Sequence, residues 1–122
     1  MADLIPGQIV VVDWRDALPK EPNKLRPAIV IEDTDLFGPD YPNVILVPLS
    51  QDQKLAIRAF SLGIDPTASN GCPNRCYALS NYVAATSKQR LRATESHITV
   101  EQLELIREQI ALAIGLDRGG SG

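Results

Sequence analysis

The sequence predicts one small, mostly β domain: a compact antiparallel barrel or sandwich with a single helix near its C-terminus. Short runs of apolar, β-branched residues recur along most of the chain, and prolines, glycines and asparagines separate them. No helical periodicity lies between these runs, which argues against a parallel α/β sheet. A chain of 122 residues suits one domain with its own hydrophobic core.

Four predicted strands occupy the first half of the chain. The first is Gln8 to Trp14, with the β-branched sequence QIVVVDW. Pro27 opens the second, Ala28 to Ile31, because a missing N–H is tolerated at the first residue of a strand. The third is Val44 to Leu49, and the alternation over Ala56 to Leu62 predicts a fourth.

Two further short strands are predicted at Cys76 to Leu79 and Tyr82 to Thr86, with a bend between them. The intervening segments 15–25, 33–43 and 65–75 are rich in proline and other turn residues and are predicted to be loops.

The predicted helix begins at Thr99, whose side chain can cap it, and Gln102 completes a capping box. A single apolar stripe follows at helical spacing, formed by Leu103, Ile106, Ile110 and Ile114. Gly115 supplies the stop, and the helix is expected to cover the barrel as a lid. The domain is therefore assigned to residues 1–116, with a flexible tail at 117–122.

Charge and hydropathy limit the functional classes. The net charge of −3 argues against a non-specific coat for nucleic acid. The segment from Arg75 to Thr94 nevertheless carries four basic residues and no acid, so it could hold a few phosphates or form a solvated strand edge. No apolar run approaches the length of a membrane span, and no signal sequence opens the chain. A cytoplasmic protein without membrane contact is expected.

The scarcity of histidine excludes several kinds of site. His97 is the only histidine, so a two-histidine ribonuclease mechanism is impossible, and a structural or surface role is favoured for this residue. Cys72 and Cys76 with His97 fall short of the four ligands of a structural zinc site. The cysteines are interpreted as reduced thiols near a turn, with a turn-closing disulfide as the alternative. No metal is expected because these ligands are too few, and no cofactor is expected because phosphate-binding and dinucleotide motifs are missing.

One group of side chains offers chemistry. Glu21 lies in the first long loop, Arg26 at its end, and Ser50 follows the third predicted strand. If the second and third strands pair antiparallel, Arg26 and Ser50 meet at one rim of the barrel, with the Glu21 loop above them. The alternative is an ion pair between Glu21 and Arg26, with Ser50 capping a turn.

The same segments resemble a family. Glu21 to Val30 (EPNKLRPAIV) resembles the E-x4-R-P-A-x-V segment of the MazF/PemK (Kid) toxins of bacterial toxin–antitoxin pairs. Gly7 to Trp14 resembles the family's G-x-I-V-x-V-D-aromatic opening. The resemblance continues in Val47 to Ser50, in Val83 to Leu91 and in the C-terminal helix.

This resemblance implies an SH3-like barrel, a homodimer and a ribosome-independent endoribonuclease that cuts short motifs in single-stranded RNA. It also implies a cognate antitoxin that occupies the RNA groove. By position, Arg26 matches the catalytic arginine and Glu21 the acidic residue of the same loop, while Ser50 stands where many members have threonine. The basic residues expected to bind RNA are Lys24, Arg75, Lys88 and Arg90.

The implied chemistry suits these side chains. The 2′-hydroxyl of RNA can attack the adjacent phosphorus and give a 2′,3′-cyclic phosphate without a metal. Arg26 would stabilise the phosphorane, Glu21 would accept the proton, and Ser50 would position the phosphate. Two alternatives stay open: a catalytically silent binding module, and a gyrase-poisoning toxin of the same fold. The helix end Ala113 to Leu116 lacks the aromatic residue typical of gyrase poisons.

Overall fold

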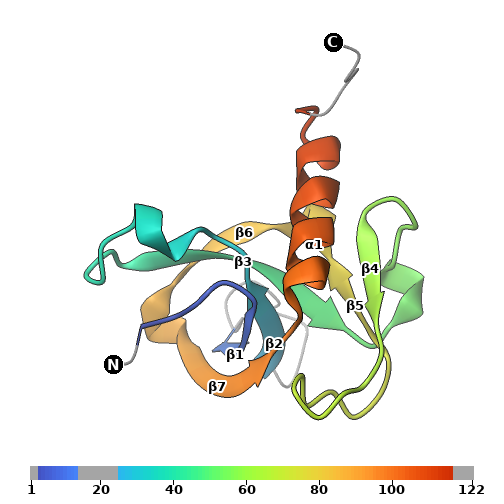
Figure 1. The fold of residues 1–122 in the computed structure, drawn as a ribbon, viewed down its shortest axis with the longest axis horizontal. Coiled ribbons are helices and arrows are strands. Elements are labelled where there is room, and N and C mark those ends of the chain that lie inside the picture. Colours follow the sequence, from blue (N-terminus) through green and yellow to red (C-terminus); the bar gives the residue numbers. More distant parts are fainter. Residues whose placement is uncertain (1–2, 14–24, 117–122) are drawn as a thin grey trace.

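The computed structural model describes residues 3–13 and 25–116, and Figure 1 shows the fold. Within these residues the chain forms seven strands, four short 3-10 turns and one α-helix. The strands are β1 (Gln8–Asp13), β2 (Leu25–Val30), β3 (Asn43–Ser50), β4 (Ser61–Ile64), β5 (Cys76–Leu79), β6 (Ala84–Ser87) and β7 (Leu91–His97). The helix is α1 (Val100–Ala113). No helix among the described residues is long and apolar enough to cross a membrane.

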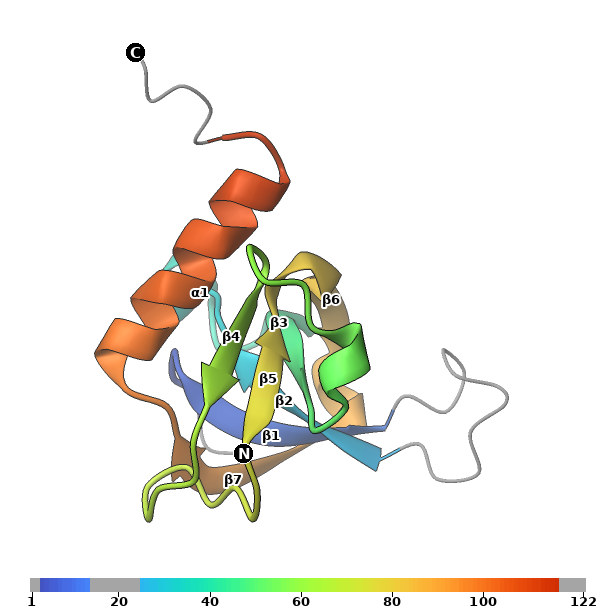
Figure 2. The ribbon, with the colours of Figure 1, turned by 90° about the vertical axis from the view of Figure 1, so that its right-hand side faces the viewer.

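The strands form one strongly curved antiparallel sheet. Its order is β4-β5-β3-β2-β1-β7, and β6 joins the edge of β3 outside this path. The sheet curls around itself in Figures 1 and 2, but the described strands do not close the ring by hydrogen bonds. The mostly β, barrel-like fold with a C-terminal helix confirms the predicted fold class.

Both faces of the central strands are buried, which explains their continuous β-branched sequences. One face carries a core of Val10, Val12, Ala28, Val30, Val44 and Leu46. The opposite face carries a larger core, with Ile9, Ile29, Val47, Leu49 and Ile64 from the strands and Ile98, Leu103 and Ile106 from the chain around α1. The second core is where the helix is anchored to the sheet.

The start and stop of α1 follow the local sequence. Thr99 Oγ1 accepts a hydrogen bond from the Gln102 N–H at 3.0 Å, and Gln102 Oε1 accepts from the Thr99 N–H at 2.9 Å. This confirms the capping box. Gly115 has a φ of +85°, the left-handed conformation in which glycine carries no Cβ penalty.

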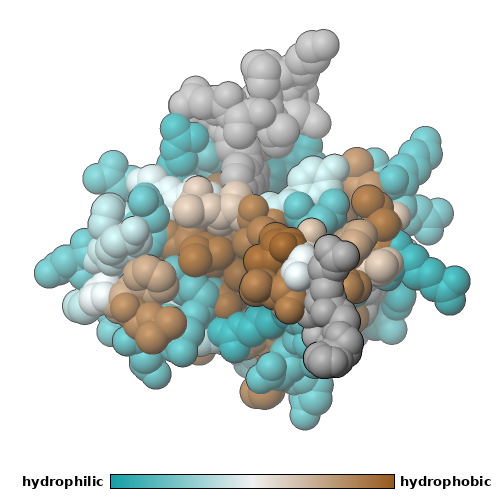
Figure 3. Space-filling view, turned by 90° about the horizontal axis from the view of Figure 1, so that it is seen from above, coloured by the Kyte–Doolittle hydropathy of each residue, from teal (hydrophilic) through white to brown (hydrophobic). Residues whose placement is uncertain are grey.

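The helix covers less of the sheet than the apolar stripe predicted. Leu103 and Ile106 are buried, but Ile114 at the far end of the stripe is 63% exposed. The cause is visible in Figure 2, where the C-terminal half of α1 extends beyond the strands. Figure 3 views the face from which the helix projects and shows apolar surface gathered near its centre.

Two strand predictions, at 56–62 and 82–86, need correction. The predicted strand 56–62 is largely a turn, in which the Phe60 N–H donates to the Ile57 carbonyl, and β4 starts only at Ser61. The predicted strand 82–86 is shifted, because Tyr82 ends a 3-10 turn and β6 is Ala84–Ser87.

Strand β2 already includes Leu25 and Arg26, so Pro27 lies inside it rather than at its start. Its recorded pairs with β3 begin at Ala28, and the missing proline N–H therefore interrupts none of them. The polar strand β7 was not predicted, although it pairs with β1 along most of its length. Trp14 and the tail 117–122 lie outside the described residues.

Candidate functional site

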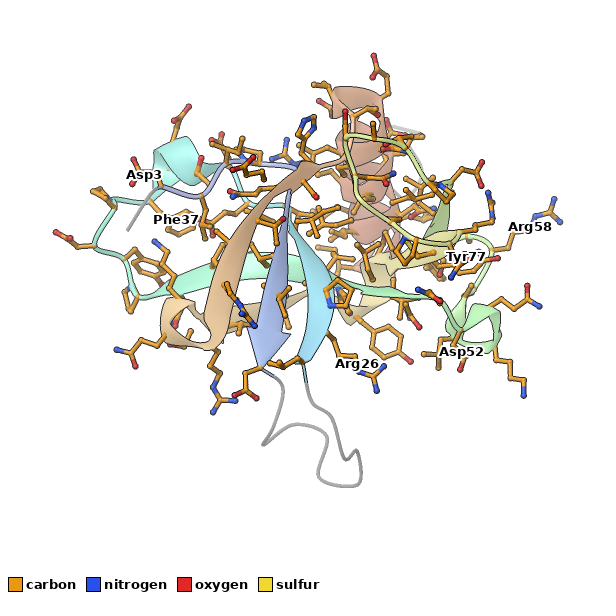
Figure 4. The ribbon with its side chains drawn as sticks, turned by 90° about the horizontal axis from the view of Figure 1, so that it is seen from below. Asp3, Arg26, Phe37, Asp52, Arg58 and Tyr77 are labelled. Atoms are coloured by element: carbon orange, nitrogen blue, oxygen red, sulfur yellow. The ribbon has the colours of Figure 1, made fainter. Side chains whose placement is uncertain are left out.

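Arg26 and Ser50 stand on neighbouring strands at the same end of the sheet. Strands β2 and β3 pair antiparallel, with Ala28 opposite Pro48, so the start of β2 and the end of β3 share one edge. The pairing on which the sequence argument depended is therefore confirmed. Figure 4 shows the Arg26 side chain beside the start of β2, on the same side of the molecule as Asp52, which follows β3. Both Arg26 and Ser50 are half-buried.

The Ser50 hydroxyl organises the turn that follows β3. Its Oγ accepts a hydrogen bond from the Asp52 N–H at 3.0 Å. The Asp52 carboxylate in turn accepts from the Lys54 N–H at 2.9 Å and caps the 3-10 turn Gln53–Leu55. A hydroxyl that accepts in this way still has its own proton to donate. Ser50 can thus cap the turn and donate to a phosphate oxygen at the same time.

Ser50 lines a small cavity between the sheet and the loop before β5. The cavity has a volume of about 190 Å³, and Pro27, next to Arg26, lies in its wall. The remaining wall consists of uncharged residues: Ile9, Leu49, Gln51, Asn70, Gly71, Cys72, Pro73, Cys76, Thr94 and Ser96. Its hydroxyl and amide groups can bind polar atoms, but any positive charge must come from outside the wall.

Arg75 is a cation close to this cavity. Its Nη1 donates to the Asp65 carboxylate at 2.5 Å, and its guanidinium lies 5.6 Å from the centre of the Tyr77 ring. The hydrogen bond and charge of Asp65, together with Tyr77, raise the pKa of Arg75, which is therefore permanently charged. Tyr77 lies opposite Ser50 in the β3–β5 ladder, so Arg75 is close to the end of β3.

Gly63 provides the space for Arg75. Gly63 lies opposite Tyr77 on β4, and a Cβ there would overlap the Arg75 guanidinium. The side chain can therefore lie across the β4 backbone. Its ion pair with Asp65 is exposed, with side-chain exposures of 52% and 75%, so a phosphate could replace the carboxylate at little cost.

The other basic residues are distributed differently from Arg75. Lys88 lines a second cavity, of about 760 Å³, together with four acids, Asp3, Glu32, Asp35 and Asp40. Asp3 and Phe37 of this cavity are far from Arg26 in Figure 4. Four carboxylates around one lysine repel RNA phosphates, so the larger cavity is the poorer candidate for an RNA site.

Arg90 is exposed in the 3-10 turn Lys88–Arg90, next to Lys88. Glu21 and Lys24 lie outside the described residues. The predicted site is thus brought together at Arg26 and Ser50, with Arg75 nearby and Lys88 elsewhere.

The structure also places the histidine and the two cysteines that the sequence singled out. His97 is exposed at the end of β7, in agreement with the surface role favoured from sequence. No cluster of three or more potential ligands that could hold a metal ion occurs among residues 3–13 and 25–116. Sequence reasoning missed that Cys72 and Cys76 share a cavity with Ser50. Only their spacing within one proline- and glycine-rich loop signalled a shared position.

Comparison with known proteins assigns the chain to a family. The family model for PemK-like, MazF-like toxins of type II toxin-antitoxin systems matches residues 5–114. The chain belongs to this toxin family. The match confirms the resemblance noted in the sequence and covers both described parts of the sheet and α1. Comparison with curated proteins gave no match.

Solved structures support the same fold. MazF from Deinococcus radiodurans is 16% identical, with a TM-score of 0.71 over 94% of this chain and 99% of that chain. The Mycobacterium tuberculosis toxin MazF-mt6 is 20% identical, with a TM-score of 0.66 over 92% and 98%. A mycobacterial endoribonuclease in complex with its cognate antitoxin is 16% identical, with a TM-score of 0.69 over 93% and 96%. At these identities the likeness shows the fold alone.

Proposed function

We propose that this toxin-family chain is an endoribonuclease that cuts single-stranded RNA at short sequence motifs. The observation that carries the proposal is the position of Arg26 and Ser50 on adjacent strand ends in a chain of the PemK/MazF-like family. Solved relatives with the same fold are themselves described as endoribonucleases.

Arg26 is assigned the binding of the scissile phosphate. An arginine guanidinium presents a planar set of charged donors that matches phosphate oxygens. During attack by the 2′-hydroxyl, negative charge builds up on the nonbridging oxygens of a five-coordinate phosphorus. Arg26 would hold these oxygens more tightly in the transition state than in the ground state, which lowers the barrier.

Ser50 is assigned the positioning of the scissile phosphate through its hydroxyl proton. The hydrogen bond from the Asp52 N–H holds the Ser50 oxygen in place, so the hydroxyl is already positioned before RNA binds. Glu21 is assigned the acceptance of the 2′-hydroxyl proton, since a carboxylate is ionised at neutral pH. The 5′-oxygen leaves, and the products are a 2′,3′-cyclic phosphate and a 5′-hydroxyl. This route requires no metal ion.

Lys24, Arg75, Lys88 and Arg90 remain the proposed RNA-binding residues, and the structure supports them to different degrees. Arg75 has the best support, because its ion pair with Asp65 is exposed and it lies close to the end of β3. Lys88 has the weakest support, because the carboxylates around it compete with phosphate for its charge.

Two protein partners belong to the proposal. A cognate antitoxin would neutralise the toxin, as expected for a member of a toxin–antitoxin family. A second copy of the chain would form a homodimer. The exposed leucines and isoleucine near the end of α1, Leu112, Ile114 and Leu116, provide apolar surface for such a contact.

The test is cleavage of a long, mixed-sequence single-stranded RNA in EDTA. Wild type is expected to give discrete fragments that end in 2′,3′-cyclic phosphate. Arg26→Ala is expected to lower the rate by about 10²-fold or more, because it removes transition-state charge stabilisation. Arg58→Ala is the matched control, since Arg58 is an exposed arginine far from Arg26 in Figure 4. It is expected to cut like wild type.

Each outcome decides between explanations. An Arg26→Ala rate within about threefold of wild type would remove Arg26 from the proposed mechanism. Equal losses in Arg26→Ala and Arg58→Ala would indicate general electrostatic attraction of RNA rather than catalysis. No cleavage by folded wild-type protein would favour a binding module and direct the next assay to gyrase.

A further inference from the structure

The sulfur atoms of Cys72 and Cys76 are in direct contact. Both thiols are reduced in this structure, and the Cys76 thiol donates a hydrogen bond to Cys72 Sγ at 3.3 Å. A disulfide bond is about 2.05 Å long, so the two sulfurs need approach by little more than about 1 Å to bond. Cys72 and Cys76 thus form a thiol pair.

The loop that carries Cys72 is held in place by one buried side chain. Asn70 is 4% exposed, and its Oδ1 accepts from the Thr67 N–H at 3.0 Å and from the Cys72 N–H at 2.9 Å. Its Nδ2 donates to the Asp65 carbonyl at 2.9 Å. These bonds fix the backbone at Cys72, so little conformational freedom remains to be lost when the thiol pair bonds.

The two thiols differ in access. Both cysteines line the cavity beside Ser50, but Cys72 is half-buried, whereas Cys76 is only 5% exposed and packs in the larger core. Burial, followed by the hydrogen bond with Cys72, raises the pKa of the Cys76 thiol to about 12. A reagent in the cavity therefore meets the more exposed Cys72 first, and the Cys76 thiol beside it stays protonated.

We propose that the thiol pair is a thiol–disulfide exchange site, which a small-molecule disulfide oxidises to an intramolecular Cys72–Cys76 bond. Three observations carry the proposal: the contact between the sulfurs, the cavity through which a reagent reaches the more exposed Cys72, and the burial of Cys76 in contact with it. The site stands independently of RNA cleavage, although it shares the cavity wall with Ser50.

The exchange has two balanced steps. The Cys72 thiol loses its proton to water, and its thiolate attacks one sulfur of the reagent. The reagent's S–S bond breaks, one thiolate leaves and takes up a proton, and a mixed disulfide forms on Cys72. Cys76 then loses its proton, attacks Cys72 Sγ and displaces the second thiolate. The protein loses two electrons and two protons, and the reagent becomes two thiols.

Oxidised glutathione is a suitable probe for this chemistry. Reduced protein is incubated with it, quenched in acid, treated with a maleimide after denaturation and analysed by intact mass. Wild type is expected to lose the mass of two hydrogen atoms and to take up no maleimide, and dithiothreitol is expected to reverse this. Cys76→Ser is expected to stop at the first step, with one glutathionyl group on Cys72.

Cys72→Ser is the matched control, because it retains the buried thiol alone. Its Cys76 is expected to react at least about 10-fold more slowly than Cys72 in the Cys76→Ser variant. Since a buried serine can disturb the core, Cys76→Ala provides a second form of the trapping variant, and thermal unfolding verifies that each variant is folded.

The proposal is overturned if folded wild type keeps two maleimide-reactive thiols under conditions that modify Cys76→Ser. It is also overturned if wild type accumulates a stable glutathione adduct, since Cys76 then does not resolve it. The mass readout requires no RNA, so a failed cleavage assay leaves this result unaffected. A failed oxidation experiment likewise leaves the RNA-cleavage result unaffected.

Discussion

Leu103 and Leu112 provide a matched test of how the C-terminal helix is anchored to the sheet. Both are leucines of α1, but Leu103 is 7% exposed and Leu112 is 45% exposed. Leu→Ala removes three carbon atoms, each worth about 0.8 kcal/mol when fully buried. At Leu103 the transfer loss is therefore about 2.4 kcal/mol, and an unfilled cavity brings the total to about 3 kcal/mol.

At Leu112 roughly half of this transfer energy is lost, because the side chain is already half-exposed, and the space left behind opens to solvent. Alanine's higher helix propensity returns a few tenths of a kcal/mol, so the expected loss is about 1 kcal/mol. For a chain of this size, about 4 °C of Tm corresponds to 1 kcal/mol, which predicts losses of about 12 °C for Leu103→Ala and about 4 °C for Leu112→Ala.

Urea denaturation and thermal scans measure both variants, each at a low and a high protein concentration. If a second copy of the chain covers Leu112, the loss of stability caused by Leu112→Ala grows with protein concentration. The loss caused by Leu103→Ala then stays constant. Equal losses at the lowest concentration would refute the reasoning, because they would mean that both ends of α1 are packed equally against the sheet.

Two further predictions follow from single contacts. Ser50→Ala removes the acceptor of the Asp52 N–H and is expected to cost about 0.5–1.5 kcal/mol in urea denaturation. Under the proposed function it also lowers RNA cleavage by about 10-fold or more, through loss of a hydrogen bond to a charged phosphate, and Ser50→Thr is expected to restore both. Activity unchanged in Ser50→Ala would remove its phosphate contact from the mechanism. The second concerns pH: the pKa of Cys76 rises from its ordinary value of 9.0 to about 12 on folding, so the folded state holds an extra proton between these values. The stability contributed by Cys76 is complete below pH 9 and is lost as the pH rises towards 12, so Cys76→Ala is expected to show a shallower alkaline loss of stability than wild type. Parallel stability–pH curves would contradict the raised pKa.

The parts of the fold that the sequence predicted are those that local chemistry or dense apolar patterning determines. The capping box at Thr99 and the glycine stop at Gly115 depend on neighbours within four residues, and both were predicted correctly. The long apolar runs of β1 and β3 placed these strands within about two residues of their observed ends. Antiparallel pairing of adjacent strands then brought Arg26 and Ser50 to one edge.

The parts of the fold and site that were not predicted depend on contacts between residues far apart in the sequence. Strand β7, with the sequence LRATESH, contains few apolar residues and is ordered by pairing with β1 from the other end of the chain. Its side chains are mostly exposed or half-buried, so its composition resembles a loop. The charge environment of Lys88 likewise depends on acids from distant segments, which lie around one cavity only after folding.

The pairing of β1 with β7 has a consequence for biosynthesis. The two strands are separated by about 80 residues, and at about 5–20 residues per second the ribosome needs roughly 4–16 s to make the second after the first. During that interval one edge of β1 lacks its native neighbour, so the growing chain exposes an unsatisfied strand edge. A nascent toxin is therefore most prone to association, and most open to capture by another strand, before β7 leaves the ribosome.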